Sequence, residues 1–283
     1  MTTTTTTTTT TKKVALVTGA SSGMGKAFAI QLQEAGFLVY GVARRTDRMN
    51  DLSARGINTF AMDITDDAST SDGVRRILAE TGRIDVLVNN AGYGSFGAVE
   101  DVPLEEVRRQ FEVNVFGAAR LVQLVLPSMR SRKSGTIINI TSMGGKIYTP
   151  FGAWYHATKF AFESFSDCLR LETKPFGINV VIIEPGAIRT EFNGIAADNL
   201  IETSGKGAYA DKAAKVAKAA RAENTRLSSP PELVARTVVK AATARRPKTR
   251  YAVGFGAKPL IFTRSILPDR AYDAMILRVS GAH

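Results

Sequence analysis

Short apolar runs rich in β-branched residues recur along most of the chain, and longer amphipathic stretches separate them. The runs cover residues 14–18, 37–42, 57–62, 84–88, 136–141 and 178–183. Near-continuous apolar runs of this length are typical of strands buried on both faces of a sheet, and each interval can hold a helix. The alternation predicts parallel strands joined by right-handed crossovers. We therefore expect an α/β protein with a doubly wound parallel sheet, whose first helix spans about residues 23–35.

The two ends of the chain depart from this pattern. Residues 2–11 are ten consecutive threonines, which cannot bury apolar area, so residues 1–11 are expected to form a disordered tail. Residues 12–283 are expected to form a single domain, because no internal repeat interrupts them. Within that domain we expect a substrate lid over about residues 194–228 and a C-terminal extension over residues 229–283.

The composition fits a packed globular protein, with 44% hydrophobic and 22% charged residues in a chain of 283. No stretch approaches the ~18 uncharged apolar residues of a membrane span, and the amino terminus has no apolar signal core. The sequence therefore predicts no membrane span and a soluble, cytoplasmic protein. The chain has one cysteine, Cys168, which is expected to pack in the core, and two histidines. That set is too small for an ordinary zinc site, so no metal is expected.

The charge is unevenly distributed along the chain. Lysine and arginine together number 37 and aspartate and glutamate 26, a formal net charge of +11. Residues 205–264 hold fourteen of the basic residues and three of the acidic ones, which accounts for the whole net charge. The segment leaves open a non-catalytic nucleotide-binding sensor or a nucleic-acid-binding module, since a basic surface attracts polyanions. It also places the net charge beside the predicted lid and the mouth of a substrate site.

A glycine-rich turn follows the first predicted strand. Glycines 19, 23 and 25 stand in the sequence Thr-Gly-Ala-Ser-Ser-Gly-Met-Gly, where they let the backbone turn tightly and approach a phosphate at the amino end of the next helix. An ordinary strand-to-helix turn is the alternative, but the position after the first strand favours dinucleotide binding. The cofactor-binding residues expected in this turn are Gly19, Ser21, Ser22, Gly23, Met24 and Gly25.

The residues after the second strand bear on the choice of nucleotide. A carboxylate there binds the ribose 2′-hydroxyl of NAD, whereas an arginine accommodates the 2′-phosphate of NADP. Here Ala43 is followed by Arg44 and Arg45, so we expect NADP(H) to be preferred over NAD(H). After the third strand, Asp63 could bond the adenine amino group or cap the following helix, and Ile64 is expected beside it.

Six motifs then follow one another in a characteristic order. They are Gly19-x3-Gly23-x-Gly25, Asn89-Asn-Ala-Gly92, Asn114, Ser142, Tyr155-x3-Lys159 and Pro185-Gly186. In this order and spacing the chain resembles the short-chain dehydrogenase/reductase (SDR) family over about residues 13–195. The resemblance implies a Rossmann-type fold and an enzyme that interconverts an alcohol and a ketone or aldehyde by hydride transfer with a nicotinamide cofactor.

Tyr155 and Lys159 are four residues apart, so on a helix they face the same side. A nearby ammonium should favour the ionised form of a tyrosine, whose reference pKa is ~10, and make it usable as an acid or base near neutral pH. By resemblance, Tyr155 transfers a proton to or from the substrate oxygen, and Ser142 hydrogen-bonds that oxygen. The resemblance further implies that Lys159 binds the nicotinamide ribose and that Asn114 holds a water linking Lys159 to solvent.

Further cofactor contacts are implied by the same resemblance. Asn90, Ala91 and Gly92 would line the adenosine side, and Tyr155 and Lys159 would also reach the cofactor. The loop after the sixth strand would meet the nicotinamide amide and the pyrophosphate through Pro185, Gly186, Ile188 and Thr190.

The substrate residues can be predicted only as a group of apolar and aromatic side chains around the Ser142–Tyr155 segment. The candidates are Tyr93, Phe96, Met143, Tyr148, Phe151, Trp154 and Phe192. They indicate an apolar pocket, although each could equally pack a loop. The tail from residue 250 is similar to that of the 17β-hydroxysteroid and retinol-type dehydrogenases, which implies a lipophilic alcohol or carbonyl substrate.

Two surface features bear on partners. The predicted Tyr155 helix carries apolar area that is consistent with a homodimer or homotetramer, or with core packing alone, through Phe160, Phe162, Phe165 and Leu169. Four basic residues spread over about half the circumference of another predicted helix, namely Lys212, Lys215, Lys218 and Arg221. A solvated face is the simplest explanation, and an anionic group on the substrate or an anionic membrane surface that presents a lipid would suit them better than nucleic acid. We therefore expect a small lipophilic carbonyl or alcohol as the partner, and no nucleic acid.

Overall fold

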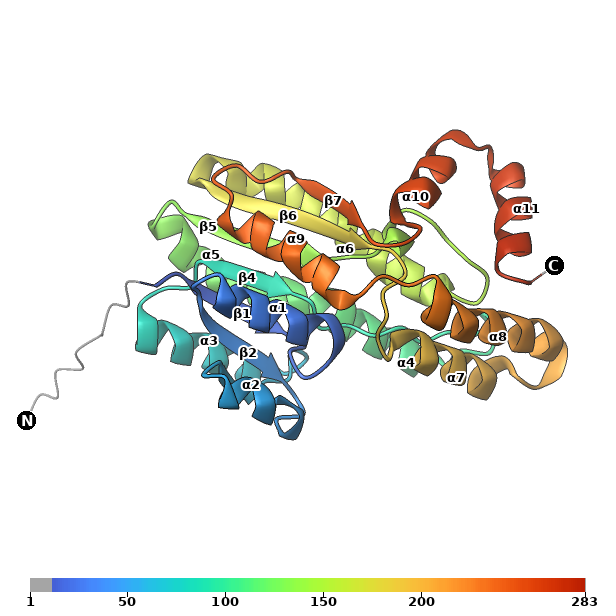
Figure 1. The fold of residues 1–283 in the computed structure, drawn as a ribbon, viewed down its shortest axis with the longest axis horizontal. Helices are drawn as coiled ribbons and strands as arrows, with labels where there is room; N and C mark the ends of the chain where they lie inside the picture. Colours follow the sequence, from blue (N-terminus) through green and yellow to red (C-terminus); the bar gives the residue numbers. More distant parts are fainter. Residues whose placement is uncertain (1–11, 283) are drawn as a thin grey trace, which may run out of the picture.

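The computed structural model describes residues 12–282, apart from the side chains of residues 222–226. Its centre is a parallel sheet with the strand order β3-β2-β1-β4-β5-β6-β7 (Figure 1). The strands are β1 (Val14–Thr18), β2 (Leu38–Ala43), β3 (Asn58–Ala61), β4 (Val86–Asn89), β5 (Gly135–Ile140), β6 (Ile178–Pro185) and β7 (Arg250–Val253). The order reverses between β1 and β4, which confirms the predicted doubly wound α/β fold. The threonine tract, predicted to be a disordered tail, lies outside the described residues.

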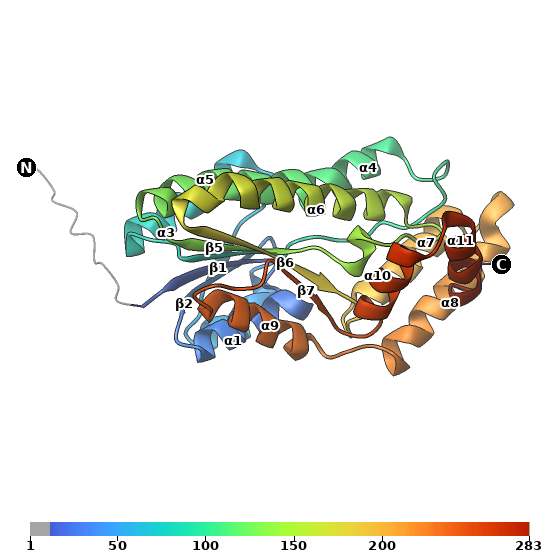
Figure 2. The ribbon, with the colours of Figure 1, turned by 90° about the horizontal axis from the view of Figure 1, so that it is seen from above.

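Helices cover both faces of the sheet (Figure 2). α1 and α9 pack side by side on one face, and α3, α5 and α6 cover the other. The α-helices are α1 (Gly23–Glu34), α2 (Asn50–Ala54), α3 (Asp67–Thr81), α4 (Leu104–Phe111), α5 (Gly117–Ser131), α6 (Ala153–Thr173), α7 (Phe192–Ser204), α8 (Ala210–Arg226), α9 (Pro231–Thr243), α10 (Ala257–Ile266) and α11 (Asp269–Val279). Since α9 and β7 complete these layers, the chain after residue 229 contributes to the central core as well as to the helices beyond it.

Burial of the strands matches the apolar runs in the sequence. β1, β4 and β5 are buried along their whole length, as strands covered by helices on both faces must be. The six predicted strands are confirmed, with ends shifted by at most two residues. The edge strand β7 was not predicted, because it begins with Arg250 and its four residues are only partly buried.

The parallel strands all end at one edge of the sheet, where α7, α8, α10 and α11 gather (right-hand side of Figures 1 and 2). α7 and α8 pack against each other around a small core of Ala197, Leu200, Ala213 and Ala217. α11 packs through Tyr272 against Ile147. Ligands of open α/β sheets bind at this edge, so these helices surround the position expected for a site.

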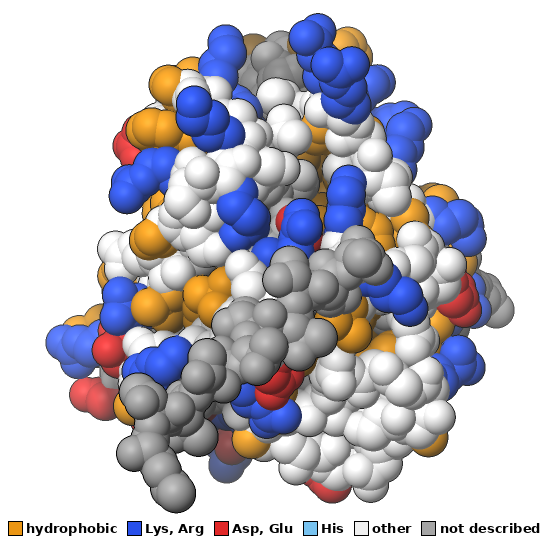
Figure 3. All heavy atoms as spheres, turned by 90° about the vertical axis from the view of Figure 1, so that its left-hand side faces the viewer, with side chains coloured by type: hydrophobic (Ala, Val, Ile, Leu, Met, Phe, Trp, Pro, Cys, Tyr) orange, Lys and Arg blue, Asp and Glu red, His pale blue; other side chains and the backbone are white. Residues whose placement is uncertain are grey.

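The basic residues of segment 205–264 do not form one surface. The lysines of α8 are exposed near the strand ends, but residues 245–248 precede β7 and therefore lie at the opposite edge, where the strands begin. Figure 3 shows that opposite face, over which Lys and Arg side chains are spread. Arg250 turns inward, and its Nη2 lies 2.7 Å from Glu163 Oε2. The prediction that the net charge lies beside the substrate mouth is therefore wrong, and a nucleic-acid site based on this segment loses its support.

Candidate active site

The turn between β1 and α1 folds tightly on itself. Gly19 and Gly23 have left-handed backbones, with φ of 68° and 51°, a region that glycine enters without strain. A Cβ on Gly25 would lie 2.2 Å from the carbonyl oxygen of Gly19, and a Cβ on Gly19 would lie 2.9 Å from the side-chain nitrogen of Asn90. The Ser22 side chain does not cap α1, which leaves the amide N–H groups of its first turn for an anion. This geometry fits the pyrophosphate of a dinucleotide.

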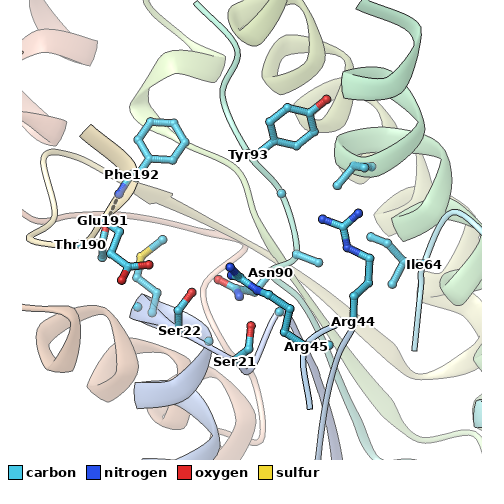
Figure 4. Close-up of a pocket in the computed structure, with 18 of the residues that line it drawn as sticks. Ser21, Ser22, Arg44, Arg45, Ile64, Asn90, Tyr93, Thr190, Glu191 and Phe192 are labelled. Carbon is cyan, nitrogen blue, oxygen red and sulfur yellow. Dashed lines mark hydrogen bonds between the residues drawn. The ribbon is translucent and has the colours of Figure 1, made fainter. Parts of the chain in front are cut away.

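A pocket opens over this turn at the carboxyl ends of the strands (Figure 4). Fourteen predicted cofactor residues line it, namely Gly19, Ser21, Ser22, Gly23, Met24, Gly25, Arg44, Arg45, Asp63, Ile64, Asn90, Ala91, Gly92 and Thr190. Tyr93 and Phe192, predicted for the substrate, line the same pocket. The lining residues that were not predicted are Val42, Ala43, Met62, Gly94, Val113, Glu191 and Ile195. Val42, Ala43 and Met62 stand at or just after the ends of strands. Their positions could have been predicted, because ligands of such sheets bind at the carboxyl ends of the strands.

The two arginines after β2 extend in different directions. Arg44 extends toward Ile64 and Tyr93, and Arg45 extends toward the side of the pocket that holds Ser21 and Ser22 (Figure 4). Each presents a forked donor suited to a phosphate at the end of β2.

Asp63 is engaged in a local turn. Its Oδ1 accepts hydrogen bonds from the Thr65 N–H at 3.0 Å and the Thr65 hydroxyl at 2.8 Å. Burial acts to raise the pKa of Asp63, but these bonds and the positive charge of Arg44 outweigh it and lower that pKa. The cap of α3 is Asp66, which accepts from the Ser69 N–H, so Asp63 does not cap that helix. Asp63 lines the pocket, which is consistent with the predicted bond between its carboxylate and the adenine amino group.

The loop after β6 only partly faces the pocket. Thr190 lines it, whereas Pro185, Gly186 and Ile188 are not among the lining residues. The Gly186 N–H donates to the Val253 carbonyl at 2.8 Å, and a Cβ on Gly186 would lie 2.0 Å from the Phe255 carbonyl oxygen. Glycine is thus required at position 186 for close packing against the end of β7.

Asn114 lies in an irregular part of a long helical segment. α4 continues into α5 through a π-helical stretch, Glu112–Phe116, and such stretches often occur at functional sites. A Cβ on Gly92 would lie 3.0 Å from Asn114 Oδ1 and 3.8 Å from Lys159 Nζ. The absence of a side chain at position 92 therefore lets Asn114 and Lys159 approach the end of β4 together.

Ser142, Tyr155 and Lys159 meet beyond the end of β5. Ser142 follows that strand, and its Oγ accepts a hydrogen bond from the Gly144 N–H at 3.0 Å. Tyr155 and Lys159 lie one turn apart on α6 and are both buried, with Tyr155 9% exposed. Lys159 Nζ donates to the Ile140 carbonyl at 3.1 Å and lies 6.0 Å from the centroid of the Tyr155 ring. The predicted set of polar groups is therefore brought together at the sheet edge.

The electrostatics of the pair differ from the expectation. Burial raises the pKa of Tyr155, and the neighbouring Ser142 hydroxyl opposes that rise. Burial also lowers the pKa of the Lys159 ammonium to about 8, against the negative charge of Glu163. The pKa of Tyr155 is thus raised because burial dominates, and the Lys159 ammonium donates to the Ile140 carbonyl.

Comparison with known proteins decides the family. The model of the family described as short chain dehydrogenase matches residues 13–200. The chain belongs to the short-chain dehydrogenase family. Like other SDRs, it is an oxidoreductase.

Relatives of this SDR match it along nearly its whole length. It is 37% identical to the 3-ketodihydrosphingosine reductase of Bacteroides thetaiotaomicron, over 91% of this chain and 94% of that protein. It is 35% identical to the NADPH-dependent 3-dehydrocapnine reductase of Ornithobacterium rhinotracheale, over 94% of this chain and 96% of that protein. A solved short-chain dehydrogenase from Streptomyces avermitilis shares 36% identity with a TM-score of 0.79, covering 96% of this chain and 98% of that one. No helix within residues 12–282 is long and apolar enough to cross a bilayer.

Aromatic rings cover Tyr155 in this SDR. The rings of Phe96 and Phe192 each lie 5.5 Å from the Tyr155 ring, measured between centroids. Phe151, just before α6, has a φ of 63°, a strained value for a bulky residue that often marks functional sites. The rings of Phe96 and Phe192 give the reacting edge an apolar surround, whereas the Phe151 ring lies 6.1 Å from that of Tyr209.

The other substrate candidates pack elsewhere. Met143 and Tyr148 belong to a cluster with α11, and the Tyr148 hydroxyl donates to Asp273 at 3.0 Å. The substrate candidates thus divide into a group around Tyr155 and a group beneath the C-terminal helices. Trp154 is partly buried, and its Nε1 has no hydrogen-bond partner within the described chain.

Two further residues of α6 test the sequence interpretation. His156 is buried, and its ring nitrogens contact the Gly144 carbonyl at 2.9 Å and the Thr149 hydroxyl at 3.0 Å. Those contacts fit the predicted packing role of a histidine between Tyr155 and Lys159. Cys168 is exposed, so its predicted place in the core is wrong, because position 168 lies on the outer side of α6.

Proposed function

We propose that this SDR is an NADP(H)-dependent enzyme that interconverts a lipophilic ketone or aldehyde and the corresponding alcohol. The observation that carries the proposal is the meeting of Ser142, Tyr155 and Lys159 beside a pocket shaped for a dinucleotide. An apolar substrate suits the aromatic rings around Tyr155. The names of the two bacterial reductases, one of them a 3-keto compound reductase, support carbonyl reduction.

The residues present fit the cofactor. Side chains on Gly19 or Gly25 would fill the cradle over the first turn of α1, and Arg44 and Arg45 offer donors for a 2′-phosphate. The NADPH dependence stated for the relative from Ornithobacterium rhinotracheale supports the same choice. When bound, the nicotinamide supplies or accepts a hydride.

The chain's own groups handle the proton and the oxygen. The Tyr155 hydroxyl gives its proton to the carbonyl oxygen in reduction and takes it back in oxidation. The Ser142 hydroxyl donates a hydrogen bond to that oxygen and steadies its developing charge. Lys159, as an ammonium, would hold the nicotinamide ribose, and Asn114 would link Lys159 to solvent through a water. Phe96 and Phe192 exclude bulk water from the reacting edge.

A carbonyl panel tests this proposal. Purified protein should oxidise NADPH with at least one lipophilic ketone or aldehyde, followed by NADPH absorbance. Tyr155→Phe should lower turnover at least ~100-fold, since the proton donor is lost, while NADPH affinity measured by fluorescence stays unchanged. Tyr40→Phe is the matched control, because Tyr40 is also buried but bonds Glu80 on another part of the sheet. Full turnover in Tyr155→Phe would contradict the mechanism.

We also propose that the protein is a homodimer. Phe116 and Phe160 are 54% and 43% exposed and lie on helical segments that pack together, the π-helical stretch and α6. Exposed aromatic rings on neighbouring helices are typical of interfaces. Light scattering should show a dimer for the wild type and a monomer for Phe116→Asp/Phe160→Asp. An unchanged mass would place the interface elsewhere. The cytoplasmic location stays a prediction.

A further inference from the structure

A buried cluster of charged side chains lies behind Lys159. Glu163 follows it by one turn of α6 and is 3% exposed, and Glu184 near the end of β6 is 2% exposed. Arg250 of β7 joins them: its Nη2 lies 2.7 Å from Glu163 Oε2, and its Nε lies 2.9 Å from Glu184 Oε1. Lys146 Nζ approaches Glu163 Oε2 from the Ser142 segment at 3.2 Å. Four parts of the chain therefore meet in one ionic cluster one helical turn from Lys159.

Packing alone does not require these charges. A buried ion costs several kcal/mol unless pairing offsets it, and apolar side chains of similar volume often give equal stability. Glu163 is also incompletely paired: its Oε1 is buried without a hydrogen-bond partner among the described residues. A carboxylate that is buried and incompletely paired costs free energy of folding. Stability therefore does not explain why position 163 is a glutamate.

Glu163 is held in place from more than one side. A Cβ on Gly145 would lie 2.8 Å from Glu163 Cγ and 3.0 Å from the Lys159 carbonyl oxygen. The turn Met143–Gly145 therefore packs directly on both residues, and Arg250 and Lys146 fix the carboxylate. The position of Glu163 relative to Lys159 is thus defined by contacts and not by the helix alone.

The other groups facing Lys159 do not offset its charge. The ammonium donates to the Ile140 carbonyl, and the Tyr155 phenol is neutral near pH 7 because burial raises its pKa. Burial lowers the pKa of Lys159 to about 8, and the opposing influence comes from Glu163. Arg250 and Lys146 also carry positive charge, and both pair with Glu163.

We propose that Glu163 is a positioning residue that keeps the buried Lys159 charged, with Arg250 and Lys146 holding its carboxylate. The inference rests on the proposed function, because in that function the charged Lys159 binds the nicotinamide ribose and lies beside Tyr155, which transfers the proton. Arg250 thereby connects the edge strand β7 to the reacting groups. Asp167 also contacts Arg250, at 3.0 Å, but lies one turn further along α6 and does not act on Lys159.

The test measures the ionisation of Lys159 directly. In the full chain with lysine labelled at Cε, an NMR titration gives the pKa of Lys159, whose signal is identified by its loss in Lys159→Arg. Glu163→Gln keeps the shape of the side chain but removes its charge, and should lower that pKa by about one unit. The alkaline limb of kcat/KM for the carbonyl reaction should move to lower pH by a similar amount. Asp167→Asn, the matched control, should move neither.

Several results would overturn the proposal. A change below about 0.2 pH units in Glu163→Gln, or an equal shift in Asp167→Asn, would assign Glu163 a purely structural role. If Glu163→Gln does not fold, Lys146→Met/Glu163→Gln is compared with Lys146→Met, because the double variant leaves one cation fewer beside the uncharged side chain and keeps Arg250 paired with Glu184 and Asp167. The NMR titration needs no substrate, so it tests this inference even if the protein turns over no carbonyl. If the enzyme is active but the pKa of Lys159 does not shift in Glu163→Gln, this inference fails and the proposed function stands.

Discussion

Asn114 holds the main chain of Tyr93 by both of its polar groups. Its Oδ1 accepts from the Tyr93 N–H at 3.0 Å, and its Nδ2 donates to the Tyr93 carbonyl at 2.8 Å. The same Nδ2 lies 3.1 Å from Thr158 Oγ1 on α6. One buried side chain in the π-helical stretch thus ties the loop after β4 to the helix that carries Tyr155 and Lys159.

Replacing Asn114 should therefore affect both stability and turnover. Asn114→Ala leaves the partly buried N–H and carbonyl of Tyr93 without these partners, and should lower the free energy of unfolding by about 2 kcal/mol. In the folded fraction, kcat should also fall. Asn139→Ala is the control, because Asn139 bonds Asn89 and Ser166 within the core; it should destabilise without the same loss of kcat. Urea unfolding and NADPH absorbance measure the two effects, and equal kcat losses would contradict the assignment.

The turn after β1 should not tolerate a side chain at position 25. A Cβ on Gly25 would lie 2.2 Å from the Gly19 carbonyl oxygen, so Gly25→Ala must open the phosphate cradle. We expect NADPH to bind more than about tenfold more weakly, since forced overpacking costs about 1–3 kcal/mol. Gly194→Ala meets open space and should leave the affinity unchanged. Fluorescence titration measures the NADPH affinity of both variants. Wild-type affinity in Gly25→Ala would contradict the proposal that this turn binds the cofactor phosphates.

Arg44 should distinguish the two nicotinamide cofactors. Arg44→Ala is expected to weaken NADPH binding by about 10- to 100-fold, because a charge-assisted pair with the 2′-phosphate is lost. NADH lacks that phosphate and should bind almost as before. Arg55→Ala, an exposed arginine outside the pocket lining, should change neither affinity. Equal losses for both cofactors would move the phosphate contact away from Arg44.

Glu184 should make stability depend on pH. Burial and the negative charge of Glu163 raise its pKa from 4.5 to about 7. Between those values the unfolded chain has released the proton while the folded protein keeps it, so the stability from this group is full below pH 4.5 and lost as the pH rises through 7. Glu184→Gln cannot titrate and should narrow the difference in Tm between pH 5 and pH 8. An unaltered difference, by scanning fluorimetry, would show that Glu184 is ionised throughout.

Much of the fold and of the cofactor site could be predicted because the signals are local. Apolar runs such as 14–18 indicate central strands, since both faces of a parallel sheet are covered. Gly19 and Gly23 mark a turn with left-handed backbones, and Gly25 allows the close approach of the Gly19 carbonyl. The four-residue spacing of Tyr155 and Lys159 fixes their common helix face without knowledge of the rest of the chain.

Other features depend on contacts between distant residues, and these only the tertiary structure decided. The sequence contains Glu163 and Arg250 but does not say that they pair, because 87 residues separate them and β7 had to be placed beside β6 first. The exposure of Cys168 depends on which side of α6 faces the sheet, and the scattering of segment 205–264 depends on α9 and β7 joining the core. The pKa values of Tyr155, Lys159 and Glu184 follow burial, which is a property of the packed protein and not of residue type. The sequence by itself therefore determined the six central strands and the groups that carry the chemistry, while tertiary packing placed the edge strand β7 and decided how the charges are balanced.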